Sequence, residues 1–391
     1  MHAHDQQTSL APVIILASAA FVFNTTEFIP VALLSDIGTS FGMSSSQTGM
    51  IMTIYAWIVA ILSLPMMLIT AKIERKTLLL AVFALFAISH LVSYLASSFQ
   101  MLIISRAMVA VTHAVFWSIT ASLVVRLAPN GMQTKALGLL STGGALAMVL
   151  GLPLGRMLGQ WLGWRASFGV IGITSLIIAL LLLYYLPKLP AKNTGDLSSL
   201  PLIFKNKPIL LIYLLILLTV TANFTFYSYI EPFVLTVANL GGQIATITLL
   251  IFGLAGVIGS VLFGRYFDKT PVVFTKTAMF GMLAMLIALN HLTSLFLVIV
   301  AIYGLCYMAT NQALQKLLLN QAREHTDIAM AVFSTFFNVA IGLGAIVGGW
   351  TVEYIGLAYI GYMAAGVMVI VVACHLFSRQ LFIDQEKLNL R

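Results

Sequence analysis

An acidic side chain inside an apolar stretch is the strongest candidate for chemistry. Glu27 lies in the segment NTTEFIP (24–30), with Asn24 three residues earlier on the same helical face. Pro30 has no N–H group, so a backbone carbonyl nearby is left free to accept another hydrogen bond. Insertion of an ionisable residue such as Asp at the centre of a bilayer costs roughly 2.5 to 3.5 kcal/mol. We therefore predict that Glu27 gains and loses a proton; the alternative is a structural carboxyl group that hydrogen-bonds a neighbouring helix.

A second polar stripe lies in the fourth apolar stretch. Arg106, Ala110, His113 and Trp117 are spaced by four, three and four residues, so a helix projects them from one face. We predict that His113 faces an aqueous cavity; a histidine that bonds another helix is the alternative. For Arg106 the alternative is a helix-end arginine that snorkels or bonds carbonyl groups.

Polar and aromatic residues recur in the second half of the chain. We predict that Asn24 and Trp117 bind substrate together with Asn223, Tyr227, Glu231, Tyr307, Asn311 and Asn338. Glu231 directly precedes Pro232 near the outer boundary, where we expect partial solvation, and it ranks below Glu27. Asn338 provides a neutral hydrogen-bonding group or an interhelical contact. The tyrosines have an alternative as interfacial anchors.

The elements that carry these residues must cross a membrane. The 391 residues are 60% hydrophobic and 8% charged, with a mean hydropathy of +1.03. Soluble domains are roughly 45–50% apolar and about 25% charged, so a soluble protein is excluded. The net charge of +8 comes from scattered lysines and arginines, which favours membrane topology over a nucleic-acid partner. Cys306 and Cys374 lack a CxxC partner and indicate neither metal nor redox chemistry.

A helix needs about 20 apolar residues to cross a bilayer, and breaks in the sequence define twelve such spans. Their predicted cores are 12–35, 47–70, 77–96, 101–125, 135–160, 166–187, 208–237, 244–266, 272–290, 295–319, 328–352 and 357–377. The predicted fold is an all-α integral membrane protein. A break with four lysines at 188–207 divides it into a half at 1–187, a cytoplasmic linker and a half at 208–391.

Charge distribution and internal similarity indicate orientation and function. All lysines and arginines except Arg106, Arg156 and Arg165 lie in or beside alternate breaks, which places both termini in the cytoplasm by the positive-inside rule. Glycine-rich segments occupy the fifth span of each half, GGALAMVLGLPLGRMLG and VAIGLGAIVGGW. Close packing against a neighbouring helix is sufficient to explain the first. Two pseudo-symmetric six-helix bundles are typical of an alternating-access transporter, and no catalytic motif favours an enzyme.

Five segments together resemble a known family over nearly the whole chain. They are NTTEFIPVALLSDI (24–37), MTIYAWIVAILSLP (52–65), ISRAMVAVTHAVFWSITASL (104–123), LGLPLGRMLGQWLGWRASF (150–168) and YSYIEPF (227–233). They resemble the major facilitator superfamily, in particular its drug/proton antiporter branch and the bacterial sugar efflux transporters of the SotB type.

The resemblance implies roles for individual residues. Glu27 and His113 would be proton-linked groups, and Arg106 would fill the fourth-helix arginine position. Structural or gating positions would be Asp36 in the first-helix motif, Gly151, Pro153 and Gly155 in the antiporter motif, and Gly264 with Asp268 in the turn of the second half. The equivalent turn of the first half departs from the family pattern, since Ala71 takes the acidic position and Glu74 the second glycine position.

The function expected from these residues and this resemblance is proton-coupled antiport. A monomer in a bacterial inner membrane would export sugars or sugar-like molecules, such as arabinose or thiogalactosides, by alternating access. The proton is the coupling ion, and no cofactor or metal is expected. The other partners are the small-molecule substrate and membrane lipid. A broad-specificity drug/proton antiporter for amphipathic compounds is the alternative, and a channel or a membrane-embedded enzyme are two further classes.

Overall fold

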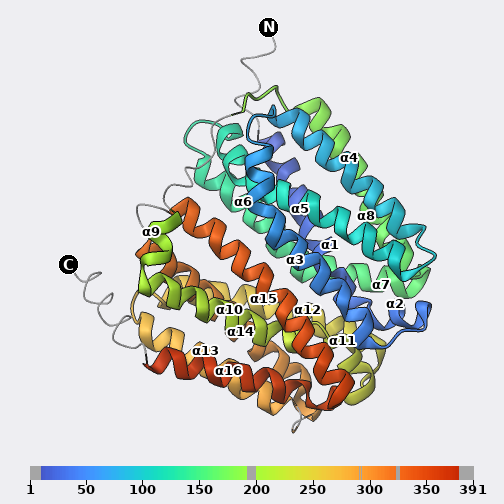
Figure 1. The fold of residues 1–391 in the computed structure, drawn as a ribbon, viewed down its shortest axis with the longest axis vertical. Coiled ribbons are helices and arrows are strands. Elements are labelled where there is room, and N and C mark those ends of the chain that lie inside the picture. Colours follow the sequence, from blue (N-terminus) through green and yellow to red (C-terminus); the bar gives the residue numbers. More distant parts are fainter. Residues whose placement is uncertain (1–9, 192–199, 290, 292, 323–325, 378–391) are drawn as a thin grey trace. The chain divides into compact units, whose positions relative to one another are not determined.

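A computed structural model describes residues 10–191, 200–289, 291, 293–322 and 326–377 (Figure 1). Helices are the only regular secondary structure within these ranges. Twelve helical segments in the described residues are long and apolar enough to cross a membrane, which confirms the twelve predicted spans. They are 11–32, 45–69, 75–94, 99–127, 135–162, 164–185, 207–227, 241–266, 271–288, 296–321, 328–354 and 357–377.

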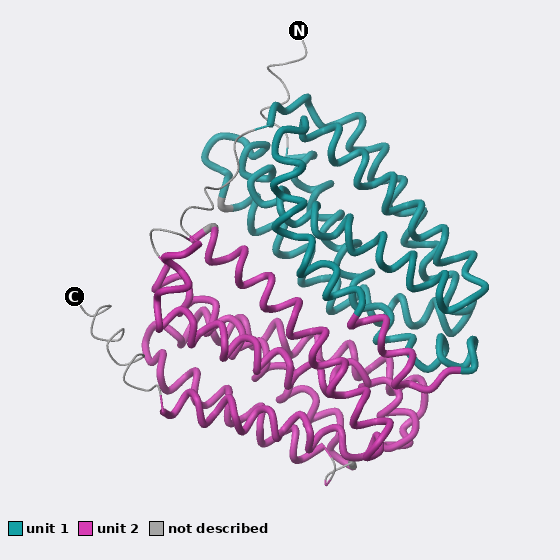
Figure 2. Tube along the Cα trace, in the orientation of Figure 1, with its two compact units in different colours: residues 1–42, 54–194 teal, residues 43–53, 195–391 magenta. Residues whose placement is uncertain are grey.

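The chain divides into two compact units, coloured separately in Figure 2: residues 1–42 with 54–194, and residues 43–53 with 195–391. Residues 192–199 of the predicted linker lie outside the described residues. The helices up to the linker are α1 (Ala11–Ala32), α2 (Leu34–Phe41), α3 (Ser45–Ile69), α4 (Arg75–Tyr94), α5 (Phe99–Leu127), α6 (Gln133–Leu146), the π-helix η2 (Ala147–Gly151), α7 (Leu152–Leu162) and α8 (Trp164–Tyr185).

The helices beyond the linker form six further spans, as the helices before it do. They are α9 (Leu200–Lys205), α10 (Lys207–Tyr227), α11 (Ile230–Pro232), the π-helix η4 (Phe233–Val237), α12 (Gly241–Tyr266), α13 (Pro271–Ala288), η5 (Thr293–Leu295), α14 (Phe296–Gln321), α15 (Thr326–Tyr354), η6 (Leu357–Tyr359) and α16 (Ile360–Phe377). The most buried spans are α1 in the first unit and α10 in the second, so equivalent helices form the core of each unit.

Two predicted spans end three or more residues earlier than expected, and a third is interrupted. The first ends at Ala32 rather than 35, with Pro30 inside its last turn. The seventh ends at Tyr227 rather than 237 and continues as α11 and η4. The fifth contains a π turn at Ala147–Gly151, which ends two residues before Pro153. Proline has no N–H to donate and crowds the preceding turn, which accounts for the irregular backbone beside Pro153.

Glycines bring α6, η2 and α7 into close contact with α1. A Cβ atom added at each glycine would collide with a residue of α1 or with Leu33, which follows α1 directly. The pairs are Gly143 with Ala17, Gly151 with Thr25, Gly155 with Ile29, and Gly159 with Leu33. In the second unit, a Cβ at Gly344 of α15 would lie 2.7 Å from the Thr221 carbonyl of α10. The fifth span of each half therefore packs tightly on the first, as the glycine pattern predicts.

The turn between α3 and α4 holds the first residues after α8. The Glu74 carboxylate accepts hydrogen bonds from the amides of Leu189 at 2.6 Å, Thr77 at 2.8 Å and Lys76 at 3.0 Å. The Arg75 amide donates to the Leu189 carbonyl, and Arg126 donates to the Pro190 carbonyl, both at 3.0 Å. Partial burial alone would raise the pKa of Glu74, but these hydrogen bonds outweigh it and lower the pKa to about 2. Glu74 thus caps α4 and anchors the chain leaving α8.

Replacing Gly143 by Ala should destabilise the first unit. The added methyl group collides with the Ala17 backbone, and overpacking of this kind costs about 1–3 kcal/mol. Gly138→Ala is the matched control on α6, because a Cβ there meets no atom within 4 Å and alanine favours the helix. Thermal unfolding of the detergent-solubilised protein should show a lower midpoint for Gly143→Ala only. Equal midpoints for the two variants would contradict the packing.

Replacing Glu74 by Ala should release the chain after α8. The depressed pKa means that the ionised carboxylate stabilises the fold above pH 4.5, the ordinary value, and that this contribution is lost as the pH falls toward 2. At pH 7 we expect faster hydrogen exchange at the Leu189 amide in Glu74→Ala than in the wild type. Lys72→Ala, an exposed change in the same turn, should exchange as the wild type does. Unchanged exchange in Glu74→Ala would show that the carboxylate does not hold Leu189.

Candidate functional site

The first unit contains a buried polar cluster around Arg106 of α5. Arg106 is 0% exposed, and its guanidinium lies 4.5 Å from the centre of the Tyr55 ring. Its Nη1 donates to the Thr26 hydroxyl at 3.1 Å, and its Nη2 donates to the Glu27 backbone carbonyl at 3.5 Å. Arg106 therefore does not snorkel to the interface; it joins α5 to α1.

Glu27 and His113 meet inside this cluster. The distance from Glu27 Oε2 to His113 Nε2 is 3.7 Å, and both side chains are buried. Arg106 binds the backbone of Glu27 rather than its carboxylate, so the carboxyl group keeps the capacity to take up a proton. His113 Nδ1 has no hydrogen-bond partner in the described part of the chain. The predicted pair thus lies within the range of a charge interaction, while its aqueous access and its proton exchange stay predictions.

His90 completes the cluster, and sequence reasoning missed it. Its Nδ1 lies 2.8 Å from the Phe86 carbonyl, and its Nε2 lies 2.7 Å from the Thr26 hydroxyl. A carbonyl only accepts, so we assign the proton to Nδ1, and Nε2 then accepts from Thr26. The hydroxyl oxygen of Thr26 in turn accepts from Arg106. The result is a directed hydrogen-bond chain from Arg106 through Thr26 and His90 to α4.

A signal for His90 is present in the sequence. It is an ionisable residue within the third apolar span, in ISHLVSYL (88–95), and this is the criterion that selects Glu27 in the first span. Its hydrogen-bond partner Thr26 lies 64 residues earlier in the chain. The importance of a single histidine in an apolar helix therefore becomes clear only when the helices are packed together.

The other predicted residues of the first unit take different positions. Asn24 is half-buried against α6, where a Cβ at Gly144 would lie 2.8 Å from its Nδ2. Trp117 is half-buried with its ring centre 6.2 Å from that of His113. Asp36 belongs to the separate helix α2, and its Oδ2 has no hydrogen-bond partner among the described residues. Asn24 and Trp117 therefore flank the Glu27–His113 pair on the same two helices, whereas Asp36 does not.

The second unit contains an amide and aromatic cluster on α10, α12 and α14. The Tyr303 hydroxyl donates to Asn223 Oδ1 at 2.7 Å. Phe252 lies between three tyrosines, with ring-centre distances of 4.6 Å to Tyr227, 5.5 Å to Tyr303 and 6.2 Å to Tyr307. Asn223, Tyr227 and Tyr307 thus lie in one cluster, and their binding of substrate stays a prediction. Phe252 was missed because an apolar residue in an apolar span gives no signal.

Glu231 departs from its predicted surroundings. It is 1% exposed, so the expected partial solvation is wrong. α10 ends at Tyr227 and α11 begins at Ile230, so the four-residue helical spacing that linked Glu231 to Tyr227 does not continue through this break. The short α11 instead turns Glu231 into the interior.

Four further predicted residues lie apart from the aromatic cluster or at its edge. Asn338 is buried and donates to the Ser334 carbonyl of its own helix at 3.0 Å, which is not the interhelical contact considered as its alternative. Its Oδ1 has no hydrogen-bond partner in the described ranges. Asn311 is half-buried on α14. Gly264 and Asp268 are exposed at the end of α12 and in the turn that follows it.

Comparisons with known proteins identify the family. The model of the Major Facilitator Superfamily matches residues 15–326. A protein of Helicobacter acinonychis named "Probable sugar efflux transporter" is 47% identical over 92% of both chains. One of the same name from Mannheimia succiniciproducens is 46% identical over 90% of both.

Solved structures share the fold. A bacterial homolog of the human lysosomal transporter Spinster, in an inward-facing and unoccupied conformation, has a TM-score of 0.75 at 15% identity and covers 99% of this chain and 98% of its own. A D-xylose–proton symporter has a TM-score of 0.73 at 17% identity and covers 95% and 97%. At these identities the likeness concerns the fold alone. With the twelve spans and the family match, the chain belongs to the Major Facilitator Superfamily and is a membrane transporter rather than an enzyme.

Proposed function

We propose that this protein exports sugars or sugar-like small molecules in exchange for protons, by alternating access, across a bacterial inner membrane with both termini in the cytoplasm. The observation that carries the proposal is the buried Glu27–His113 pair beside Arg106. The relatives named "Probable sugar efflux transporter", at 46–47% identity over most of the chain, support the substrate class and the direction.

The proton step follows from the charges of the first-unit cluster. With Glu27 ionised, its charge balances that of Arg106; with Glu27 protonated, the cluster carries a net positive charge. Proton loading from outside would favour return to the inward state, and release to the cytoplasm would restore the anion and permit substrate capture. One charge moving inward supplies roughly 2.3 kcal/mol per 100 mV, enough for about a fortyfold gradient of neutral substrate at one-to-one coupling.

Neutral hydrogen-bonding groups beside aromatic rings suit a sugar. In the first unit, Asn24 offers an amide and Trp117 a flat apolar ring. In the second unit, Asn223 and the Oδ1 of Asn338 offer hydrogen-bonding groups, and Tyr227 offers a ring. The density of aromatic rings around Phe252 favours a second candidate function, which is drug/proton antiport of amphipathic compounds.

Replacing Glu27 by Gln should abolish transport driven by a pH gradient. The amide keeps the shape of the side chain but cannot exchange a proton, so accumulation should fall at least tenfold while substrate–substrate exchange continues. The assay uses vesicles reconstituted with the protein and compares labelled arabinose, a thiogalactoside and a hydrophobic dye. Glu353→Gln removes an exposed carboxyl group near the end of α15 and should keep its response to the pH gradient.

Undiminished pH-driven accumulation by Glu27→Gln would remove Glu27 from the mechanism. Transport of the dye but neither sugar would favour the drug antiporter instead.

Replacing His90 by Phe should weaken proton-driven transport, because it breaks the hydrogen-bond chain that positions Arg106. Thr26 then loses its acceptor on α4, and loss of a hydrogen bond in a charged network costs about 1.5–3 kcal/mol, or roughly a tenfold or greater drop in rate. His90→Gln can accept from Thr26 and should restore part of the rate. Ser89→Ala is the control, since the Ser89 hydroxyl donates to the Leu85 carbonyl of its own helix.

The pH-gradient-driven rate and the substrate-exchange rate should both be measured in these variants. A positioning role predicts that His90→Phe affects the first more than the second, and that Ser89→Ala affects neither. Equal loss in His90→Phe and Ser89→Ala would reduce His90 to a packing residue.

A further inference from the structure

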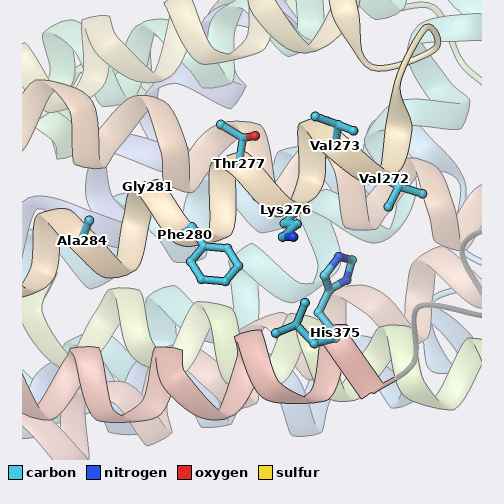
Figure 3. A pocket seen from close by; sticks show the side chains of 9 residues that line it. Val272, Val273, Lys276, Thr277, Phe280, Gly281, Ala284 and His375 are labelled. Atoms are coloured by element: carbon cyan, nitrogen blue, oxygen red, sulfur yellow. The ribbon is translucent and has the colours of Figure 1, made fainter.

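A cavity of 680 Å³ lies between α13 and α16 in the second unit (Figure 3). None of the residues of the Asn223 and Tyr303 cluster lines it. Its walls include Val273, Lys276, Phe280 and Ala284 of α13 with His375 and Leu376 of α16. It is therefore a second place on the molecule where a ligand of moderate size fits.

The lining changes from polar to apolar along the helix axis. α13 begins at Pro271, so Lys276 lies in its second turn, while Phe280 and Ala284 follow on the same face one and two turns deeper in the span. His375 lies near the end of α16, and Figure 3 shows its side chain and that of Lys276 converging from the two helices. The cavity thus has a cationic end level with the helix termini and an apolar end inside the membrane.

The cavity opens toward lipid rather than toward the interior of the unit. Val273 is 63% exposed and Phe280 is 41% exposed on a helix that spans the membrane. Apolar side chains exposed on a membrane span contact acyl chains, so a bilayer component reaches this cavity directly.

The charge at this end of the unit favours an anion. Arg265 and Lys269 precede α13 in the chain and, with Lys276, make three basic residues here. The turn contains a single acidic residue, Asp268. Clusters of basic residues at the cytoplasmic end of membrane helices attract anionic lipids, at about 1 kcal/mol per cation.

We propose that the cavity between α13 and α16 binds one anionic phospholipid of the cytoplasmic leaflet. Its phosphate lies at Lys276 and His375, and one acyl chain follows Phe280 and Ala284 into the membrane. The leaflet assignment rests on the orientation given by the positive-inside rule, whereas lipid binding is independent of the transported substrate and of proton coupling.

Native mass spectrometry of the full chain tests this proposal with phosphatidylglycerol, phosphatidylcholine and inorganic phosphate as probes. The wild type should retain one phosphatidylglycerol in preference to phosphatidylcholine. Lys276→Gln should lose about fivefold in affinity for phosphatidylglycerol alone, and Lys276→Arg should keep it. Lys205→Gln, an exposed lysine on α9, is the matched control and should bind as the wild type does. Ala284→Phe fills the apolar end and should weaken retention of the lipid without changing the charge.

Three results would overturn the proposal. Equal retention of the two lipids would show that the cavity has no headgroup preference. Unchanged affinity of Lys276→Gln for phosphatidylglycerol would show that Lys276 does not bind the phosphate. Competition by inorganic phosphate as strong as that by the lipid would indicate a free-anion site.

The occupant is identified by a photoreactive phenylalanine analogue placed at Ala284 of the full chain in native membranes. Cross-linking to a phospholipid supports the proposal. Cross-linking to residues 378–391, which follow α16 in the sequence, or to a second copy of the chain would show that the occupant is protein and would overturn the proposal.

Discussion

The site depends on how one buried cation is bound. Arg106 donates to the Thr26 hydroxyl and to the Glu27 backbone carbonyl, so its charge is fixed against α1 without consuming the Glu27 carboxylate. An arginine bonded to that carboxylate would hold it permanently ionised. The hydrogen bonds to Thr26 and to the backbone therefore leave the neighbouring acid chemically available, at a place where His113 lies 3.7 Å away.

The packing of α1 allows this arrangement. Glycines of α6, η2 and α7 let the helix backbones approach on one side, and on another side α1 faces Arg106 of α5 and His90 of α4. A helix held on two sides places Thr26 and Glu27 accurately, since their rotamers are limited by neighbours. The π turn beside Pro153 lies within this contact, so the irregular backbone of the fifth span belongs to the packing that positions the acid.

The sequence predicts the twelve spans and part of the polar cluster around Arg106. Both the correct predictions and the errors have physical reasons. Twelve spans follow from hydropathy because a bilayer imposes length and apolarity on each helix. Glu27 follows from its ionisable side chain within an apolar span, and Arg106 and His113 follow from helical periodicity on one helix. Glu231 was misjudged because periodicity does not pass the break after Tyr227. Glu74 finds its partner Leu189 at a separation of 115 residues, a contact that only the folded chain reveals.

In the proposed mechanism, substrate binding and protonation of Glu27 exclude each other. The most direct measurement is the number of protons released when sugar is added to the detergent-solubilised protein in weakly buffered solution, followed with a pH indicator. Linkage between the two ligands predicts release of up to about one proton per wild-type chain, and none from a chain whose Glu27 is replaced by Gln. Equal proton release from both proteins, or sugar binding by the wild type without any proton release, would show that sugar and proton do not compete through Glu27.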